Sequence, residues 1–145
     1  MDPHARAAWA GLSLAHDRRH MVRALIEGVG FAYADCLDRM RRLGVEPPGI
    51  TLTGGGARSE LWRSVLAAQL RVPLALGRSA EGPALGAAIL ALVGTGAVAD
   101  LRSAVAAAVP RMEGTTAPDP ELARLYEAVH ARFRALYPAL KSVFG

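Results

Sequence analysis

The chain has 145 residues, of which 52% are hydrophobic and 21% are charged, a composition that excludes a disordered protein. Its length suits one domain with a sizeable core, so we expect residues 1–145 to form a single domain. The net charge of +4 comes from 17 basic and 13 acidic residues. Because the arginine clusters include acids and no interleaved aromatic residues, they indicate solvated helix faces, and we expect no nucleic-acid partner.

The longest apolar stretch, residues 83–93, is too short to span a bilayer and is rich in alanine and glycine, so we expect no membrane partner. The N-terminus lacks the pattern of a signal peptide. The one cysteine, Cys36, has no internal disulfide partner, and its place on an apolar helix face predicts a buried thiol. Together these features predict a cytoplasmic protein.

The first long element is a helix predicted from Arg18 to about Arg42, after residues 1–15, which are ambiguous between strand and loop. Asp17 is a suitable N-cap and Gly44 a suitable stop. Apolar residues recur at helical spacing and predict one buried stripe, made of Val22, Leu25, Ile26, Val29, Tyr33, Cys36, Leu37 and Met40. Gly28 and Gly30 each cost up to about 1 kcal/mol in helix propensity. We therefore expect another backbone to approach this helix closely.

Two short strands are predicted next, a buried one over 50–53 and another over 73–76, with a helix over 59–70 between them. That helix should turn Trp62, Val65, Leu66 and Leu70 inward, with Trp62 in the core rather than forming a shelf for an adenine. The order strand, helix, strand, helix implies parallel strands joined by crossovers. Two strands do not make a stable sheet. Further strands must come from residues 1–15, another copy or sequence not present here, so we interpret the chain as part of a larger protein.

Three more helices complete the prediction. The first runs from Gly82 to about Gly94 and is apolar all round, so we expect it to be buried. A short helix over 100–109 precedes a loop over 110–118. The final helix occupies 119–143, with Asp119 as its N-cap and Pro120 at its first position. Its inward stripe should consist of Leu122, Leu125, Val129, Phe133, Leu136 and Leu140.

The candidate site is the turn between the first strand and its helix, formed by Gly54, Gly55, Gly56, Ala57, Arg58 and Ser59. Glycines at a helix N-terminus leave backbone N–H groups without a Cβ in the way, so an anion can approach them. The structural alternative is a tight turn that needs glycine only for a positive φ. A Walker A loop is excluded because the turn lacks its lysine.

A dinucleotide-binding fingerprint fits this turn only in part, since Ser59 replaces its third glycine and Arg78 stands where an acid is expected. An arginine there suits a 2′-phosphate, so an NADP-binding domain stays open as an alternative.

A more specific resemblance comes from longer runs. Residues 52–62, Leu-Thr-Gly-Gly-Gly-Ala-Arg-Ser-Glu-Leu-Trp, are followed at 81–88 by Glu-Gly-Pro-Ala-Leu-Gly-Ala-Ala. Both runs resemble the C-terminal domain of the FGGY carbohydrate kinases and, within them, the xylulokinases. Residues 2–6, 16–31 and 126–138 resemble the same domain in the same order, although Asp17 stands where the family often has threonine. The resemblance implies a helix-rich α/β domain of the ribonuclease H-like/actin-like ATPase type, incomplete at its N-terminal strands.

The resemblance also implies roles for the turn. Gly54, Gly55, Gly56 and Ala57 would line the adenosine and α-phosphate of ATP or ADP, while Arg58 and Ser59 would flank the base or ribose. For the last two, a solvated side chain and a helix N-cap are the structural alternatives. The intact enzyme would use ATP and Mg²⁺ to phosphorylate a ketose such as D-xylulose, which would bind through a preceding lobe.

Catalytic residues are not expected in this chain. Its six aspartates fall at helix caps, on helix faces or at the terminus, and none follows a strand into the glycine turn. His16 and His20 share a helix face without metal-binding partners, which predicts surface or capping roles. We therefore expect no metal site and an inactive fragment. A non-catalytic nucleotide-binding or oligomerisation module, forming a homodimer through an exposed sheet edge, stays open as an alternative.

Overall fold

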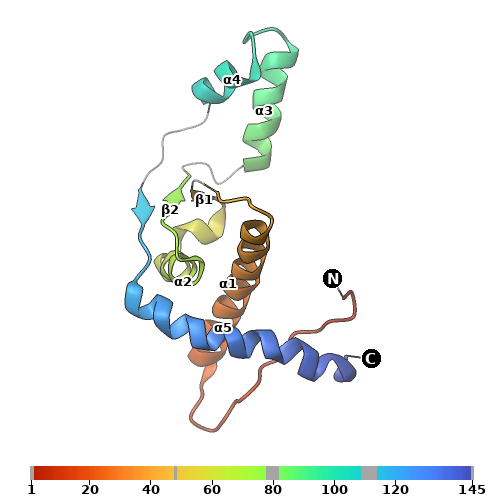
Figure 1. Cartoon of the computed structure of the whole chain (residues 1–145). Coiled ribbons are helices and arrows are strands. Elements are labelled where there is room, and N and C mark those ends of the chain that lie inside the picture. Colours follow the sequence, from red (N-terminus) through yellow and green to blue (C-terminus); the bar gives the residue numbers. More distant parts are fainter. Residues whose placement is uncertain (1, 48, 78–81, 109–113, 145) are drawn as a thin grey trace. The chain divides into compact units, whose positions relative to one another are not determined.

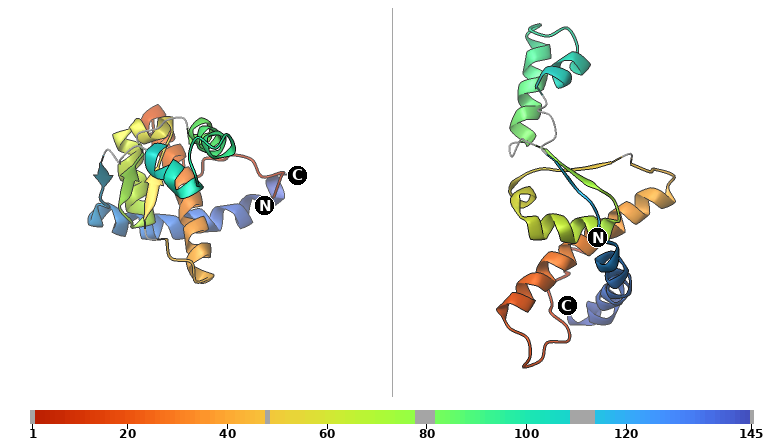
Figure 2. Two further views of the ribbon diagram at one scale, coloured as in Figure 1. Left: turned by 90° about the horizontal axis from the view of Figure 1, so that it is seen from above. Right: turned by 90° about the vertical axis from the view of Figure 1, so that its left-hand side faces the viewer.

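The computed structural model describes residues 2–47, 49–77, 82–108 and 114–144 (Figures 1 and 2). They form two compact units. The first unit consists of Met1–Glu46, Val65–Arg71 and Pro118–Gly145, and the second consists of Pro47–Ser64 and Val72–Ala117. No helix among these described residues is long and apolar enough to cross a membrane.

The first unit begins with α1, Arg18–Arg42, whose ends have the predicted chemistry. The Asp17 side chain accepts hydrogen bonds from the backbone N–H groups of Arg19 and His20 at 2.9 and 3.2 Å. In turn, the His20 Nδ1 accepts a hydrogen bond from the Asp17 N–H at 3.1 Å. At the other end Gly44 has a φ of +79°, which favours glycine. The predicted cap, stop and capping histidine are therefore confirmed.

The side of α1 that is buried differs from the prediction. Gly30, Phe31, Ala34 and Leu37 are buried, whereas most of the predicted stripe is exposed, namely Val22, Leu25, Val29, Tyr33, Cys36 and Met40. The predictions of a buried stripe and a buried cysteine were therefore wrong for these residues. The helix carries apolar residues on more than one side, and spacing alone does not tell which side a neighbour covers.

A close contact between α1 and the end of α2 (Glu60–Leu70) explains one glycine of α1. A Cβ at Gly30 would overlap Gln69 Oε1 and lie 3.2 Å from Leu66 Cδ2. The Gln69 Nε2 donates to the backbone carbonyl of Glu27 at 3.0 Å. A Cβ at Gly28 would meet only Phe133 Cε2, at an ordinary 3.7 Å. The close approach is real at Gly30, but side chains make it, so the predicted backbone contact was wrong.

The final helix, α5, spans Pro120–Leu140 and continues into a short 3₁₀ turn, η2, at Lys141–Val143. Asp119 caps it as predicted, accepting from the N–H groups of Glu121 and Leu122. Figures 1 and 2 show α5 crossing α1. Their shared core contains Phe31, Val65, Ala68 and Tyr126, with Ile26, Leu122, Ala123, Val129 and Phe133 against it. The predicted stripe is thus confirmed in part, because Leu125 is exposed and Tyr126 takes the buried place.

A partly buried polar network at the edge of this core also joins α1 to α5. Arg23 Nη2 donates to the Tyr126 hydroxyl at 2.7 Å, and that hydroxyl donates to Glu27 Oε1 at 2.8 Å. Arg23 Nε donates to the same Glu27 oxygen at 2.6 Å. Burial raises the pKa of Tyr126 to about 12. The buried hydroxyl is therefore held in its neutral form by the fold.

The second unit contains a three-stranded sheet in the order β1-β2-β3. The strands are β1, Ile50–Leu52, β2, Leu74–Leu76, and β3, Thr115–Thr116. β1 and β2 are parallel, as predicted, and β3 is antiparallel to β2. The third strand lies where the sequence predicts a loop, so the sources proposed for further strands missed it. The predicted burial of the first strand was also wrong, because β1 is half-buried with Thr51 exposed.

The other helices of the second unit are α3, Gly82–Gly94, and α4, Leu101–Ala108, which pack side by side (Figure 1). The prediction that α3 is buried was wrong, since Ile89 is its only buried residue and Leu90 is 65% exposed. α4 packs against α3, and its buried residue is Ala104. The uniform apolar character of α3 therefore did not indicate burial all round.

Candidate functional site

The candidate turn follows β1 and closes on itself. Gly54 has a φ of +84°, a conformation that side chains disfavour. The next residues, Gly55–Arg58, form a 3₁₀ turn, η1. The Ala57 N–H donates to the Gly54 carbonyl and the Ser59 N–H donates to the Gly56 carbonyl, both at 3.1 Å. The need for glycine at position 54 is thus conformational, but this reason does not extend to Gly55 and Gly56, since neither has a positive φ.

The backbone amides of the three glycines are unpaired among the residues that the structure describes. In the described part of the chain, the N–H groups of Gly54, Gly55 and Gly56 have no hydrogen-bond acceptor. Gly55 and Gly56 are exposed, and a Cβ built on Gly54 or Gly55 would meet nothing within 4 Å. An anion or a planar group could therefore approach the backbone here more closely than it could approach a residue with a side chain.

Ser59 and Arg58 differ in how far the structure accounts for them. The Ser59 hydroxyl accepts a hydrogen bond from the Trp62 N–H at 3.3 Å, which makes Ser59 the N-cap of α2. Arg58 is exposed, and its side chain has no partner among the residues that the structure describes. A role for either beside a base or ribose stays a prediction. Arg78, which bears on the NADP alternative, lies outside the described residues.

Two residues of α2, Arg63 and Trp62, lie against the turn. Arg63 Nη1 donates to the Ala57 carbonyl at 2.8 Å. Trp62 is half-buried, and its Nε1 would lie 3.5 Å from a Cβ on Gly56. The role of Arg63 beside this turn was not predicted from the sequence. The sequence does contain a signal for this role. Helical side chains lean toward the helix N-terminus, so an arginine in the first turn of α2 can reach the preceding loop.

The charges around the turn favour an anionic ligand. Arg58 and Arg63 follow the glycines within seven residues of Gly56, and Glu60 is the one acid between them. The start of α2 adds the positive end of a helix dipole, worth about 0.3–1 kcal/mol to a nearby anion. The turn therefore combines free donors, positive charge and open space.

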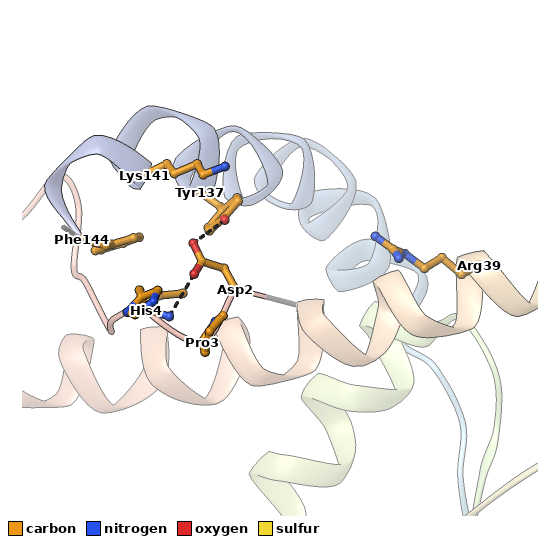
Figure 3. A pocket seen from close by; sticks show the side chains of 8 residues that line it. Asp2, Pro3, His4, Arg39, Tyr137, Lys141 and Phe144 are labelled. Carbon is orange, nitrogen blue, oxygen red and sulfur yellow. Dashed lines mark hydrogen bonds between the residues drawn. The ribbon is translucent and has the colours of Figure 1, made fainter.

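One hollow in the first unit does not compete with this turn. It measures about 920 Å³ and is lined by Asp2, Pro3, His4, Ala5, Arg39, Tyr137, Lys141 and Phe144. Figure 3 shows the Asp2 carboxylate accepting from the Tyr137 hydroxyl and the His4 N–H, at 2.7 and 2.9 Å, while Arg39 stands apart from this group. The Tyr137 hydrogen bond holds the pKa of Asp2 below its usual value. The carboxylate is already satisfied and exposed, so nothing there demands a ligand.

The residues that the structure describes form no metal site. Across residues 2–47, 49–77, 82–108 and 114–144, no three His, Cys, Asp or Glu side chains are grouped to hold an ion. His16 instead lies on the surface, where its Nδ1 accepts from the Ser13 N–H at 3.0 Å. We therefore assign no metal ligand in this part of the chain.

Comparison with known proteins identifies the domain. Residues 1–95 match the model of the FGGY family of carbohydrate kinases, C-terminal domain. The chain belongs to this family. Xylulose kinase from Escherichia coli K12 is 36% identical to it over 142 residues, which cover 96% of this chain and 28% of the relative. Erythritol kinase from Brucella abortus is 34% identical over 145 residues, covering 99% and 27%.

Structural similarity agrees with this family assignment. The crystal structure of xylulose kinase from Rhodospirillum rubrum superposes with a TM-score of 0.82 at 34% identity, covering 99% of this chain and 29% of that one. The expected helix-rich α/β fold of the actin-like ATPase type is confirmed, as is the resemblance to the xylulokinases. This chain spans less than a third of the length of these relatives.

Proposed function

We propose that this chain is the C-terminal, nucleotide-binding domain of a xylulokinase-like sugar kinase. Gly54, Gly55, Gly56 and Ala57 bind the adenosine and α-phosphate of ATP or ADP, and Arg58 and Ser59 flank the base or ribose. The observation that carries the proposal is the set of three glycine amides, which are open, have no acceptor among the described residues and lie at the start of the 3₁₀ turn that precedes α2. The fold and the family support the same ligand.

The intact enzyme, in this proposal, transfers the γ-phosphoryl group of ATP to a ketose such as D-xylulose in the cytoplasm. Xylulose kinases among the relatives support this choice of sugar. Mg²⁺ would accompany ATP, but the described residues hold no cluster of carboxylates for it, so we derive no step through the ion. Phosphoryl transfer also needs a base and a γ-phosphate site. Since neither is assigned here, the chain alone should bind nucleotide weakly and phosphorylate nothing.

Isothermal titration of the 145-residue chain with ATP, ADP and NADP tests the binding role. We expect ATP and ADP to bind and NADP not to bind. The key variant is Gly55→Ala, because its Cβ meets nothing within 4 Å in the fold but would enter the space that the nucleotide needs. Its affinity for ATP should fall about tenfold or more, the effect of overpacking a close contact.

The matched control is Gly49→Ala, which adds the same methyl group in open space before β1 rather than after it. This control should bind ATP like the wild type. Equal ATP binding by Gly55→Ala and the wild type would contradict the proposed site. Preferential binding of NADP would instead support the dinucleotide alternative.

A further inference from the structure

We propose that Arg63 is a positioning residue for nucleotide binding, whose guanidinium group holds the glycine turn in the conformation that leaves its amides open. The inference rests on the proposed function of the turn. Three consecutive glycines let a ligand approach closely, but they also give the ligand-free turn more conformational freedom than any other residues would. A turn that spends little time in its binding conformation binds weakly, in proportion to that fraction.

The contacts of Arg63 address this conflict directly. Its Nη1 donates to the Ala57 carbonyl at 2.8 Å, and its backbone N–H donates to the Ser59 carbonyl at 3.0 Å. Within the turn, the Gly54 and Gly56 carbonyls accept from the N–H groups of Ala57 and Ser59. The Ala57 carbonyl takes no part in these two bonds, so it needs another donor. By donating to this carbonyl, Arg63 satisfies an acceptor near the end of the 3₁₀ turn, as basic side chains do at helix C-termini.

The burial of Arg63 indicates that its side chain is committed to this contact. The side chain is half-buried, and its Nε is buried without an acceptor among the described residues. Burying a guanidinium nitrogen without an acceptor is unfavourable, so the hydrogen bond to the Ala57 carbonyl has to offset this cost for the side chain to stay in place. A solvated arginine would instead keep its nitrogens in water. The geometry therefore points to a brace under the turn, with Arg63 acting through Ala57 and not through the nucleotide.

The test compares Arg63→Met, Arg63→Lys and a control, Arg102→Met. Methionine keeps much of the arginine's length but donates no hydrogen bond, whereas lysine keeps the charge and a donor. Arg102 is an exposed arginine of α4 in the same unit, so its replacement removes the same charge away from the contact. We expect Arg63→Met to raise the Kd for ATP about tenfold, Arg63→Lys about threefold, and Arg102→Met not at all.

A second readout is independent of nucleotide. In the nucleotide-free chain, ¹⁵N relaxation should give Gly55 and Gly56 amide order parameters of about 0.85, falling below about 0.6 in Arg63→Met. The amide of Leu66, further along α2, should keep its order in all variants. If Arg63→Met fails to fold, Arg63→Lys carries the test, with an intermediate loss of both order and affinity expected.

The outcomes separate the two proposals. If the wild type binds ATP and Arg63→Met leaves both the affinity and the glycine order unchanged, the role of Arg63 is overturned and the proposed function stands. If the wild type binds no ATP, the proposed function fails, and with it the nucleotide role of Arg63, whatever the relaxation data show.

Discussion

The substitution Gly30→Ala tests the contact between α1 and the end of α2. The new methyl group would overlap Gln69 Oε1 and lie 2.9 Å from Gln69 Cδ, so the Gln69 side chain has to move. That movement breaks the 3.0 Å hydrogen bond from Gln69 Nε2 to the Glu27 carbonyl. Overpacking costs about 1–3 kcal/mol and the lost hydrogen bond about 1 kcal/mol, while alanine returns about 1 kcal/mol of helix propensity. We therefore expect a net loss of about 2 kcal/mol in the free energy of unfolding.

The matched variant is Gly28→Ala, in the same helix and two residues earlier. Its methyl group would lie 3.7 Å from Phe133 Cε2, an ordinary contact, and its backbone is helical. This variant should be more stable than the wild type by about 0.5–1 kcal/mol. The two glycine substitutions therefore have opposite predicted signs.

Urea unfolding followed by circular dichroism at 222 nm measures both variants. A third variant, Gly30→Ala combined with Gln69→Ala, removes the clashing amide and should be more stable than the two single changes predict together. Wild-type stability of Gly30→Ala, or an equal loss of stability in Gly28→Ala and Gly30→Ala, would refute the predicted clash with Gln69.

Three further outcomes can be measured. Because the folded state raises the pKa of Tyr126 from 10.0 to about 12, its contribution to stability is complete below pH 10 and is lost as the pH rises toward 12. Urea midpoints between pH 9 and 12 should therefore fall more steeply for the wild type than for Tyr126→Phe, and equal slopes would contradict this. Gly54→Ala places a side chain at a φ of +84° and should lose about 1–2 kcal/mol in thermal unfolding, while Gly49→Ala stays close to the wild type. Finally, a coupled ADP-release assay with ATP, Mg²⁺ and D-xylulose should show no turnover by the 145-residue chain, and activity above background would disprove the inactive-fragment proposal.

The parts of the fold that were predicted correctly depend on local chemistry. Asp17 and Asp119 cap helices because a short acidic side chain can reach the free amides one turn ahead, whatever lies elsewhere in the chain. Gly44 ends α1 for an equally local reason, its positive φ. The parallel pairing of β1 and β2 followed from the helix between them, since only a crossover of that kind joins neighbouring parallel strands.

The parts that were missed depend on tertiary neighbours. Nothing in the spacing of α1 distinguishes Phe31, which α5 covers, from Tyr33, which stays 53% exposed. β3 has only two residues and forms because β2 offers a free edge, not because Thr115 and Thr116 have a strand pattern. At the candidate turn, the glycines were visible in the sequence but the support was not, because the contact between Arg63 and Ala57 depends on how α2 leaves the turn.

The first unit is assembled from segments at opposite ends of the chain, and this has a consequence for its synthesis. Arg23 and Glu27 meet Tyr126 across about a hundred positions of sequence, and Phe31 is covered by the same helix. During synthesis α1 leaves the ribosome before Pro120–Leu140 is made, so the two helices cannot pack until the residues between them and α5 itself have emerged. Until α5 emerges, the side of α1 that it covers stays open, so α1 is exposed to aggregation while the intervening residues are made.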